Sequence, residues 1–96
     1  MADVLEQRMV HTPGLSSRVI DGEAFIITPH DNQIHNLTEV ATRVWELGGE
    51  GLTIGEIVDR ILEEYDVDRD TAESDVVNFV QDLVTRRIVT LGDSQT

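Results

Sequence analysis

Three aspartates at alternate positions, Asp66, Asp68 and Asp70, have the spacing in this chain that most resembles a metal site. The first three ligands of a calcium-binding loop follow one another at this spacing, and that loop then requires glycine at its sixth position and glutamate at its twelfth. Here Thr71 and Val77 occupy those two positions. The pattern therefore predicts an exposed acidic turn and no metal site.

The three histidines, His11, His30 and His35, are scattered over segments expected to be turns and strands. They lack the four-residue spacing and the carboxylate partner that a zinc site or a general base shows. The chain has no cysteine, which excludes disulfides and thiolate chemistry, and no lysine, which excludes a Schiff base or a phosphate-binding lysine. We expect no catalytic residue, no metal and no cofactor.

The glycine-rich segment Gly48-Gly49-Glu50-Gly51 has some likeness to a nucleotide-binding loop. Such a loop follows a strand and opens a helix, whereas this segment follows a predicted helix. It is therefore interpreted as a helix stop and a turn. Trp45 lies on the apolar face of the preceding helix and is expected in the core rather than on a binding platform.

The balance of charges excludes several classes of partner. The 96 residues include 19 acids and 7 bases, all of them arginine, which gives a formal net charge of −12. A chain this acidic repels nucleic acid unless its arginines gather on one face. No apolar run approaches the roughly 20 residues of a membrane-spanning helix, and the first residues lack the character of a secretory signal. We therefore expect a cytoplasmic protein that binds neither nucleic acid nor membrane.

Residues 17–37 have the composition and the turn signals of three short strands. Residues 17–21 and 23–28 are rich in β-branched side chains, and Asp21-Gly22 between them favours a tight hairpin turn. Residues 33–37 alternate polar and apolar side chains, as a half-buried strand does. The sequence predicts a small antiparallel sheet.

Helical spacing of apolar residues begins after this sheet. The first helix is predicted from Thr38, its N-cap, to Gly48-Gly49, where glycines end it. The second begins at Thr53, which can form a capping box with Glu56.

The third helix shows the same signal, with Asp70 as the predicted N-cap and Glu73 as its capping-box partner. It is expected to end near Arg86-Arg87, whose charges suit the negative end of the helix dipole. Residues 88–91 resemble a short strand or an extended return.

Three strands followed by three helices describe a small α+β domain of winged-helix type, with the helices packed on one face of a three-stranded antiparallel sheet. We assign residues 17–91 to this domain, residues 1–16 to an extended N-terminal arm and residues 92–96 to a flexible tail. Domains of this kind more often bind than catalyse.

A peptide-binding groove is predicted between the third strand and the third helix. Residues 33–37 come last in the strand series and carry little charge, so we expect them at the sheet edge, with backbone groups open to an incoming strand. Beside the apolar stripe of the third helix lies a second row, Val77, Val80 and Val84, expected to receive side chains of the guest. The alternative is that this row packs on the hairpin, on the N-terminal arm or on a second copy of the chain.

Several segments also carry a family pattern in their order and spacing. They are Ser17-Arg18 before Asp21-Gly22-Glu23-Ala24, Leu37-Thr38-Glu39-Val40-Ala41 with Val44-Trp45-Glu46-Leu47, Thr53-Ile54-Gly55-Glu56-Ile57, Leu62-Glu63-Glu64-Tyr65-Asp66-Val67-Asp68, and residues 75–83. Over about residues 12–91, the chain resembles the PqqD-like family of leader-peptide-binding domains, also called RiPP recognition elements. It departs from the family at Leu37-Thr38, where Leu-Asn is usual, and at Arg87-Ile88, where glycine is usual.

The resemblance implies a non-catalytic, winged-helix-like domain that captures the leader of a ribosomally made precursor peptide. Such a domain presents the peptide to a modifying enzyme, often a radical S-adenosylmethionine enzyme, as in pyrroloquinoline quinone biosynthesis, although the resemblance does not assign this chain to that pathway. The peptide is expected to add as a strand beside the third strand and to lie against the third helix. The peptide-binding residues carried over are Gln33, Ile34, His35, Asn36 and Leu37, with Val77, Val80, Gln81 and Val84 on the helix.

Two other functions stay open. A homodimeric structural subunit would bury the valine row against a second copy of the chain. A winged-helix nucleic-acid binder would place the third helix in a groove of the duplex, which the acidic residues Glu73, Asp75 and Asp82 disfavour.

Overall fold

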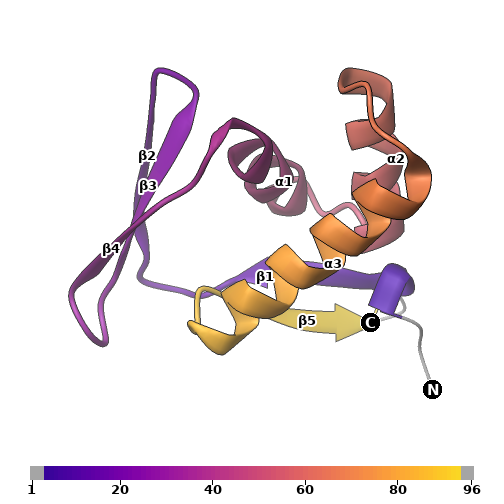
Figure 1. Cartoon of the computed structure of the whole chain (residues 1–96). Coiled ribbons are helices and arrows are strands. Elements are labelled where there is room, and N and C mark those ends of the chain that lie inside the picture. Colours follow the sequence, from indigo (N-terminus) through magenta and orange to yellow (C-terminus); the bar gives the residue numbers. More distant parts are fainter. Residues whose placement is uncertain (1–3, 94–96) are drawn as a thin grey trace.

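The computed structural model describes residues 4–93, which form two separate antiparallel sheets and three α-helices (Figure 1). One sheet has the strand order β2-β3-β4, and the other pairs β1 with β5. The predicted α+β architecture, with a three-stranded sheet followed by three helices, is confirmed. The element bounds are η1 Val4–Glu6, β1 Gln7–His11, β2 Ser16–Ile20, β3 Glu23–Thr28, β4 Gln33–Asn36, α1 Glu39–Gly49, α2 Ile54–Glu64, α3 Arg69–Thr85 and β5 Val89–Asp93.

The hairpin between β2 and β3 turns at the predicted dipeptide. Asp21 and Gly22 have φ angles of 52° and 82°, and Ile20 faces Glu23 across the two-residue loop. Two successive positive φ angles match the right-handed twist of the flanking strands, which is why an Asp-Gly pair is favoured in such loops. The local sequence therefore determines the register of β2 on β3.

The β1–β5 pair joins the two ends of the described chain. Its register runs from Gln7 opposite Asp93 to His11 opposite Val89. The segment 1–16, interpreted as an arm, thus contains η1, β1 and the first residue of β2, and residues 92 and 93 belong to β5. The rest of the expected tail, residues 94–96, lies outside the described residues.

The N-cap residues of α1 and α2 are the predicted ones, whereas that of α3 is not. Thr53 and Glu56 form the predicted capping box of α2, and Thr38 is the N-cap residue of α1, although its side chain makes no capping hydrogen bond. The prediction for α3 is wrong, because Asp68 is its N-cap residue and Asp70 lies in its first turn. Closely spaced aspartates offer several alternative caps, and their spacing alone does not select one.

The C-terminus of α3 is capped by a residue other than glycine. Arg87 has a φ of 62°, and the N–H groups of Ile88 and Arg87 donate to the carbonyls of Leu83 and Val84 at 2.9 and 3.0 Å. These bonds form a Schellman motif, in which the left-handed residue is usually glycine. Arg87 therefore occupies a position that is strained for a residue with a side chain.

Replacing Arg87 with glycine is expected to stabilise the protein by about 1 kcal/mol, because glycine adopts a left-handed φ without the clash of a Cβ. Urea denaturation of the two proteins measures this difference. Arg87→Ala, which removes the same charge and keeps the Cβ, is the matched control and should give no such gain. Equal stabilities of the Gly and Ala variants would contradict the backbone explanation.

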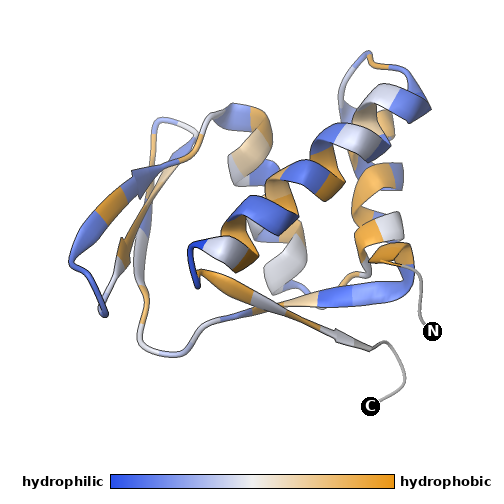
Figure 2. Ribbon diagram, turned by 60° about the horizontal axis from the view of Figure 1, so that its bottom comes forward, coloured by the Kyte–Doolittle hydropathy of each residue, from blue (hydrophilic) through white to orange (hydrophobic). Residues whose placement is uncertain are grey.

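The core lies between the helices rather than under the whole sheet. α1 is the helix that packs against β3, while α2 and α3 pack mainly on each other, on α1 and on the β1–β5 pair. Hydrophobic segments of the helices face one another in Figure 2. The hydroxyl of Thr42 on α1 accepts a hydrogen bond from the Ala24 N–H at 2.8 Å and donates to the Leu37 carbonyl at 3.2 Å. The expectation that all three helices pack on one sheet face therefore holds mainly for α1.

Candidate functional site

Strand β4 forms one edge of the three-stranded sheet, as predicted, and pairs only with β3 among the described residues. The N–H of Leu37 donates to the carbonyl of Ala24 at 2.8 Å, which fixes the direction of the backbone groups. Because hydrogen-bonded and non-hydrogen-bonded pairs alternate along an antiparallel ladder, the N–H and C=O groups of Ile34 and Asn36 point away from β3. Those groups are open to an additional strand.

A groove of about 390 Å³ separates this edge from α3. Strand β4 and the segment into α1 form one wall, and the C-terminal half of α3 forms the other. We call it the β4–α3 groove. Its lining residues are Ile34, His35, Asn36, Leu37, Thr38, Ala41, Phe79, Asp82, Leu83, Arg86 and Ile88.

A second hollow of about 230 Å³ continues the groove along α3. The two hollows share Thr38, Ala41 and Phe79, so the ring of Phe79 lies where they meet. The second hollow is lined mainly by apolar side chains of α1 and α3, with Asp75 as its charged residue. An extended peptide along β4 would therefore meet a polar region first and an apolar region next.

The predicted strand half of the site lies at the groove. Ile34, His35, Asn36 and Leu37 line it, whereas Gln33 does not. His35 and Leu37 are buried, while Ile34 is 68% exposed at the sheet edge. The alternation predicted from the sequence thus sends every second side chain toward the helices.

The predicted helix half lies elsewhere on α3. Val80 is fully buried in the core, and Gln81 is exposed and lines neither hollow. Val77 is half-buried and borders a hollow beside Val4 and Leu5, close to the N-terminal segment. Val84, which is 37% exposed, is five residues from Phe79 and therefore about 140° around the helix axis from it. The structure does not bring this row to the β4 side.

Phe79, Asp82 and Arg86 line the groove from α3 and its C-cap, together with Leu83, and none of them is among the predicted peptide-binding residues. Their spacing of three and four residues gives one helix face. Phe79 has the spacing of the apolar stripe, and Asp82 and Arg86 are charged, so the pattern of a second aliphatic row does not include them. The signal in the sequence that could have identified this face is Phe79 followed by charged residues three and seven positions later.

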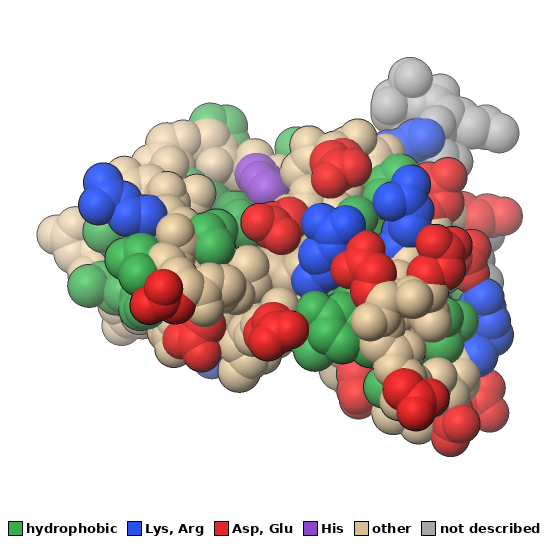
Figure 3. Space-filling model, turned by 90° about the horizontal axis from the view of Figure 1, so that it is seen from above, with side chains coloured by type: hydrophobic (Ala, Val, Ile, Leu, Met, Phe, Trp, Pro, Cys, Tyr) green, Lys and Arg blue, Asp and Glu red, His purple; other side chains and the backbone are tan. Residues whose placement is uncertain are grey.

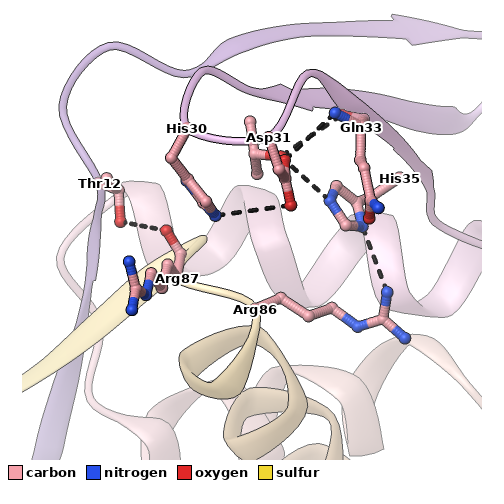
Figure 4. A network of polar contacts seen from close by, with 8 residues as sticks. Thr12, His30, Asp31, Gln33, His35, Arg86 and Arg87 are labelled. Atoms are coloured by element: carbon pink, nitrogen blue, oxygen red, sulfur yellow. Dashed lines mark hydrogen bonds and ion pairs between the residues drawn. The ribbon is translucent and has the colours of Figure 1, made fainter.

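A polar network lies under the groove at the β3–β4 turn (Figure 4). The hydroxyl of Thr28 hydrogen bonds to Asp31 Oδ1, which also accepts from the Gln33 N–H at 3.2 Å. The bond from Thr28 lowers the pKa of Asp31, to which the Gln33 N–H and the neighbouring His30 and His35 add. Asp31 is therefore a charged acceptor that orders the turn.

The opposite edge of the sheet, β2, borders a hollow of about 350 Å³ that is lined by residues of the sheet strands and by no helix residue. All five residues of β2 are exposed, and the hairpin projects away from the helices in Figure 1. The outer sheet face is apolar, with Ile20 and Ile27 49% and 40% exposed beside Phe25 and Arg18. Figure 3 shows hydrophobic side chains reaching the surface at this end of the molecule. β2 thus offers an open backbone edge without a helix wall.

His11 of β1 stacks on Trp45 of α1, which lies in the core as predicted. The ring centroids are 3.6 Å apart, and the planes are tilted by 3°. Burial lowers the pKa of His11, an effect that its hydrogen bond to the Trp45 backbone partly opposes. Nε2 of His11 is buried without a hydrogen-bond partner among the described residues, so protonation there is unfavourable.

This lowered pKa predicts a pH dependence of stability. Unfolding restores the ordinary value near 6.5, so the unfolded chain binds the proton more tightly. The contribution of neutral His11 is complete above pH 6.5 and is lost as the pH falls below it. Urea denaturation between about pH 8 and about pH 5.5 should show this decline, and His11→Phe, which keeps a ring on Trp45, should reduce it. His30→Asn serves as the control; an unchanged slope in His11→Phe would contradict the explanation.

Within the part of the chain that the structure describes, no three potential metal ligands cluster. None of the helices over the same residues is both long and apolar enough to cross a membrane.

The family model described as coenzyme PQQ synthesis protein D (PqqD) matches residues 23–89, more than half of the chain. The chain belongs to the PqqD family. The match begins at β3 and ends at the start of β5, so it includes both walls of the groove. A search of curated proteins gives no match.

Two solved structures share the fold. TbiB1, determined in complex with the TbiA(beta) leader peptide, is 32% identical, with a TM-score of 0.80 over 83% of this chain and 93% of TbiB1. A lasso peptide synthetase B1 complexed with the leader peptide is 20% identical, with a TM-score of 0.77 over 88% of this chain and 98% of that protein. The first supports membership of the family, and the second supports the fold.

Proposed function

We propose that this PqqD-family chain is a RiPP recognition element that binds the leader of a precursor peptide in the β4–α3 groove. The leader adds as a strand to β4 and directs alternate side chains toward Phe79 and the apolar hollow behind it. The observation that carries the proposal is the combination of an open strand edge with a helix-walled groove beside it. The leader-bound structures of TbiB1 and of the lasso peptide synthetase B1 support it.

The groove favours β4 over β2 as the binding edge. A strand on either edge would gain main-chain hydrogen bonds, but these alone do not select a sequence. At β4, side chains that point inward enter a groove between two walls and lose water contact. At β2, the same side chains would meet only the hollow on the outer sheet face, which has no helix wall to cover them. Binding energy and specificity therefore both favour β4.

The size of the site is consistent with micromolar affinity for a peptide. Micromolar binding requires roughly 8 kcal/mol net. Two outward-pointing residues on β4 can exchange several backbone hydrogen bonds with the guest, each worth about 1 kcal/mol net. One or two large apolar side chains buried along Phe79 and Ala41 contribute about 1.5 to 3 kcal/mol each.

The proposed role is capture without catalysis. The leader holds the precursor on this chain, and a separate modifying enzyme, of which a radical S-adenosylmethionine enzyme is one candidate, acts on the rest of the peptide. The proposal places the protein in the cytoplasm, where ribosomal precursors are made. It involves no cofactor, nucleic acid or membrane, and dimerisation is not required.

The test is calorimetric titration of the TbiA(beta) leader peptide into the protein, with sedimentation of the protein alone. We expect binding in the micromolar range or tighter by a monomer. Absence of binding, together with failure of a displayed library of random short peptides to enrich any sequence on the protein, would contradict leader capture. A stable dimer that releases no heat with peptide would favour the homodimeric subunit instead.

A further inference from the structure

The two walls of the β4–α3 groove are joined by one side-chain contact. Nδ1 of His35 on β4 lies 3.3 Å from Nη1 of Arg86, the C-cap residue of α3. Among the described residues this is the hydrogen bond that connects β4 with the end of α3, and it crosses the groove that both residues line. Figure 4 shows the guanidinium of Arg86 reaching toward the imidazole.

The partners of His35 determine its protonation. A guanidinium only donates hydrogen bonds, so Nδ1 of His35 must be the acceptor. Nε2 then carries the proton and faces the hydroxyl oxygen of Thr28 at 3.4 Å. That hydroxyl in turn donates to Asp31. The chain of donors from Arg86 through His35 and Thr28 to Asp31 is consistent only with a neutral imidazole.

We propose that neutral His35 is the positioning residue of the leader groove: it holds Arg86 across the gap and so fixes the separation of β4 and α3. This inference rests on the proposed function of the groove. Asp82 Oδ2 accepts from Arg86 Nε at 3.0 Å and holds the guanidinium from the other side. With both contacts made, the groove walls are ordered before the peptide arrives, which reduces the entropy lost on binding.

Protonation of His35 would break this arrangement. A proton on Nδ1 would remove the acceptor and place two cations at hydrogen-bond distance. The charged groups around His35 are Asp31 and His30 from the turn, and Asp82 and Arg86 from α3. Arg87 lies apart from His35, beside Thr12, in Figure 4. Asp31 can stabilise the imidazolium, so protonation would end the hold of His35 on Arg86, which keeps its contact with Asp82.

The first test needs no peptide. Long-range ¹H–¹⁵N spectra of the imidazoles at about pH 8 should show His35 as the Nε2–H tautomer. On acidification, the amide signals of Asn36 and Asp82 on the two walls should move together with the His35 ring signals. A Nδ1–H tautomer, or wall signals that follow His30 instead, would overturn the proposal.

The second test measures affinity for the TbiA(beta) leader peptide against pH. Affinity should fall about five-fold as His35 is protonated, and His35→Phe should show this lower affinity at every pH. His35→Asn offers an amide oxygen near the position of Nδ1 and cannot titrate, so it should restore most of the affinity without the pH dependence. His30→Asn should keep the wild-type profile.

The outcomes separate this inference from the proposed function. Binding that does not change with pH, or a His35→Asn variant as weak as His35→Phe, would reject His35 as the positioning residue while leader capture stands. Failure of the peptide to bind at any pH counts against leader capture, and the imidazole spectra still decide whether His35 links the walls.

Discussion

Replacing Asn36 with proline is expected to weaken binding of the TbiA(beta) leader peptide by about ten-fold or more. The N–H of Asn36 points away from β3 toward the open edge, so proline removes a donor that the guest strand would use and leaves the β3–β4 ladder intact. The loss of one backbone hydrogen bond accounts for about 1 kcal/mol, and the proline ring adds steric exclusion of the neighbouring strand. Calorimetry measures the change in affinity.

Two variants control this experiment. Asn36→Thr alters the same side chain but keeps the N–H, and it should bind the leader nearly as well as the unchanged protein. Ser17→Pro removes an N–H that points to the open edge of β2, because Val19 faces Ala24 in a non-hydrogen-bonded pair. If Ser17→Pro weakens binding and Asn36→Pro does not, the guest pairs with β2 and the β4 assignment is wrong.

Replacing Phe79 with alanine is expected to weaken leader binding by about ten-fold or more. The ring lies where the two hollows meet, and its removal takes away the largest apolar surface that a guest side chain can contact there. Phe79 is also half-buried against the core, so thermal denaturation must establish that the variant is folded at the temperature of the titration.

Val84→Ala is the matched variant on the same helix. Val84 lies on the other flank of the buried face of α3 and is partly exposed, so its truncation should change leader affinity by less than about two-fold. Comparison of Phe79→Ala with Val84→Ala shows whether the leader binds the groove observed in the structure or the valine row predicted from the sequence. A larger loss for Val84→Ala than for Phe79→Ala would show that the leader binds the opposite flank.

The elements predicted correctly are those with local signals. Asp21-Gly22 determines the first hairpin, and Thr53 with Glu56 determines the start of α2, because in each case the residues that act lie within a few positions of one another. The edge position of β4 also followed from local order, since it comes last in a series of hairpin-connected strands.

The β1–β5 pair could not be predicted in the same way. Gln7 pairs with Asp93, almost the full length of the described chain away, and Met9 is the one buried residue of β1. A five-residue segment with one buried side chain has no period to detect. Its strand conformation depends on β5 and on α1, both of which are formed by distant parts of the chain.

The α3 residues that line the groove differ from the predicted ones for a geometric reason. Spacing identifies which side chains of α3 are apolar, and the buried Val76, Val80 and Leu83 agree with it. It does not tell which flank of that buried face turns toward β4, because the crossing of α3 over α1 and the β1–β5 pair sets this rotation. Val77 and Val84 lie on one flank of the buried face, and the groove lies on the other.

Amide hydrogen exchange, measured by NMR with and without the TbiA(beta) leader peptide, tests the central claim most directly. In the free protein, the N–H groups of Ile34 and Asn36 face solvent and should exchange rapidly. Strand addition at β4 predicts that the peptide protects both amides while Ser17 and Val19 on β2 stay unprotected. Protection on β2, or bound peptide with Ile34 and Asn36 still exchanging as in the free protein, would contradict the account.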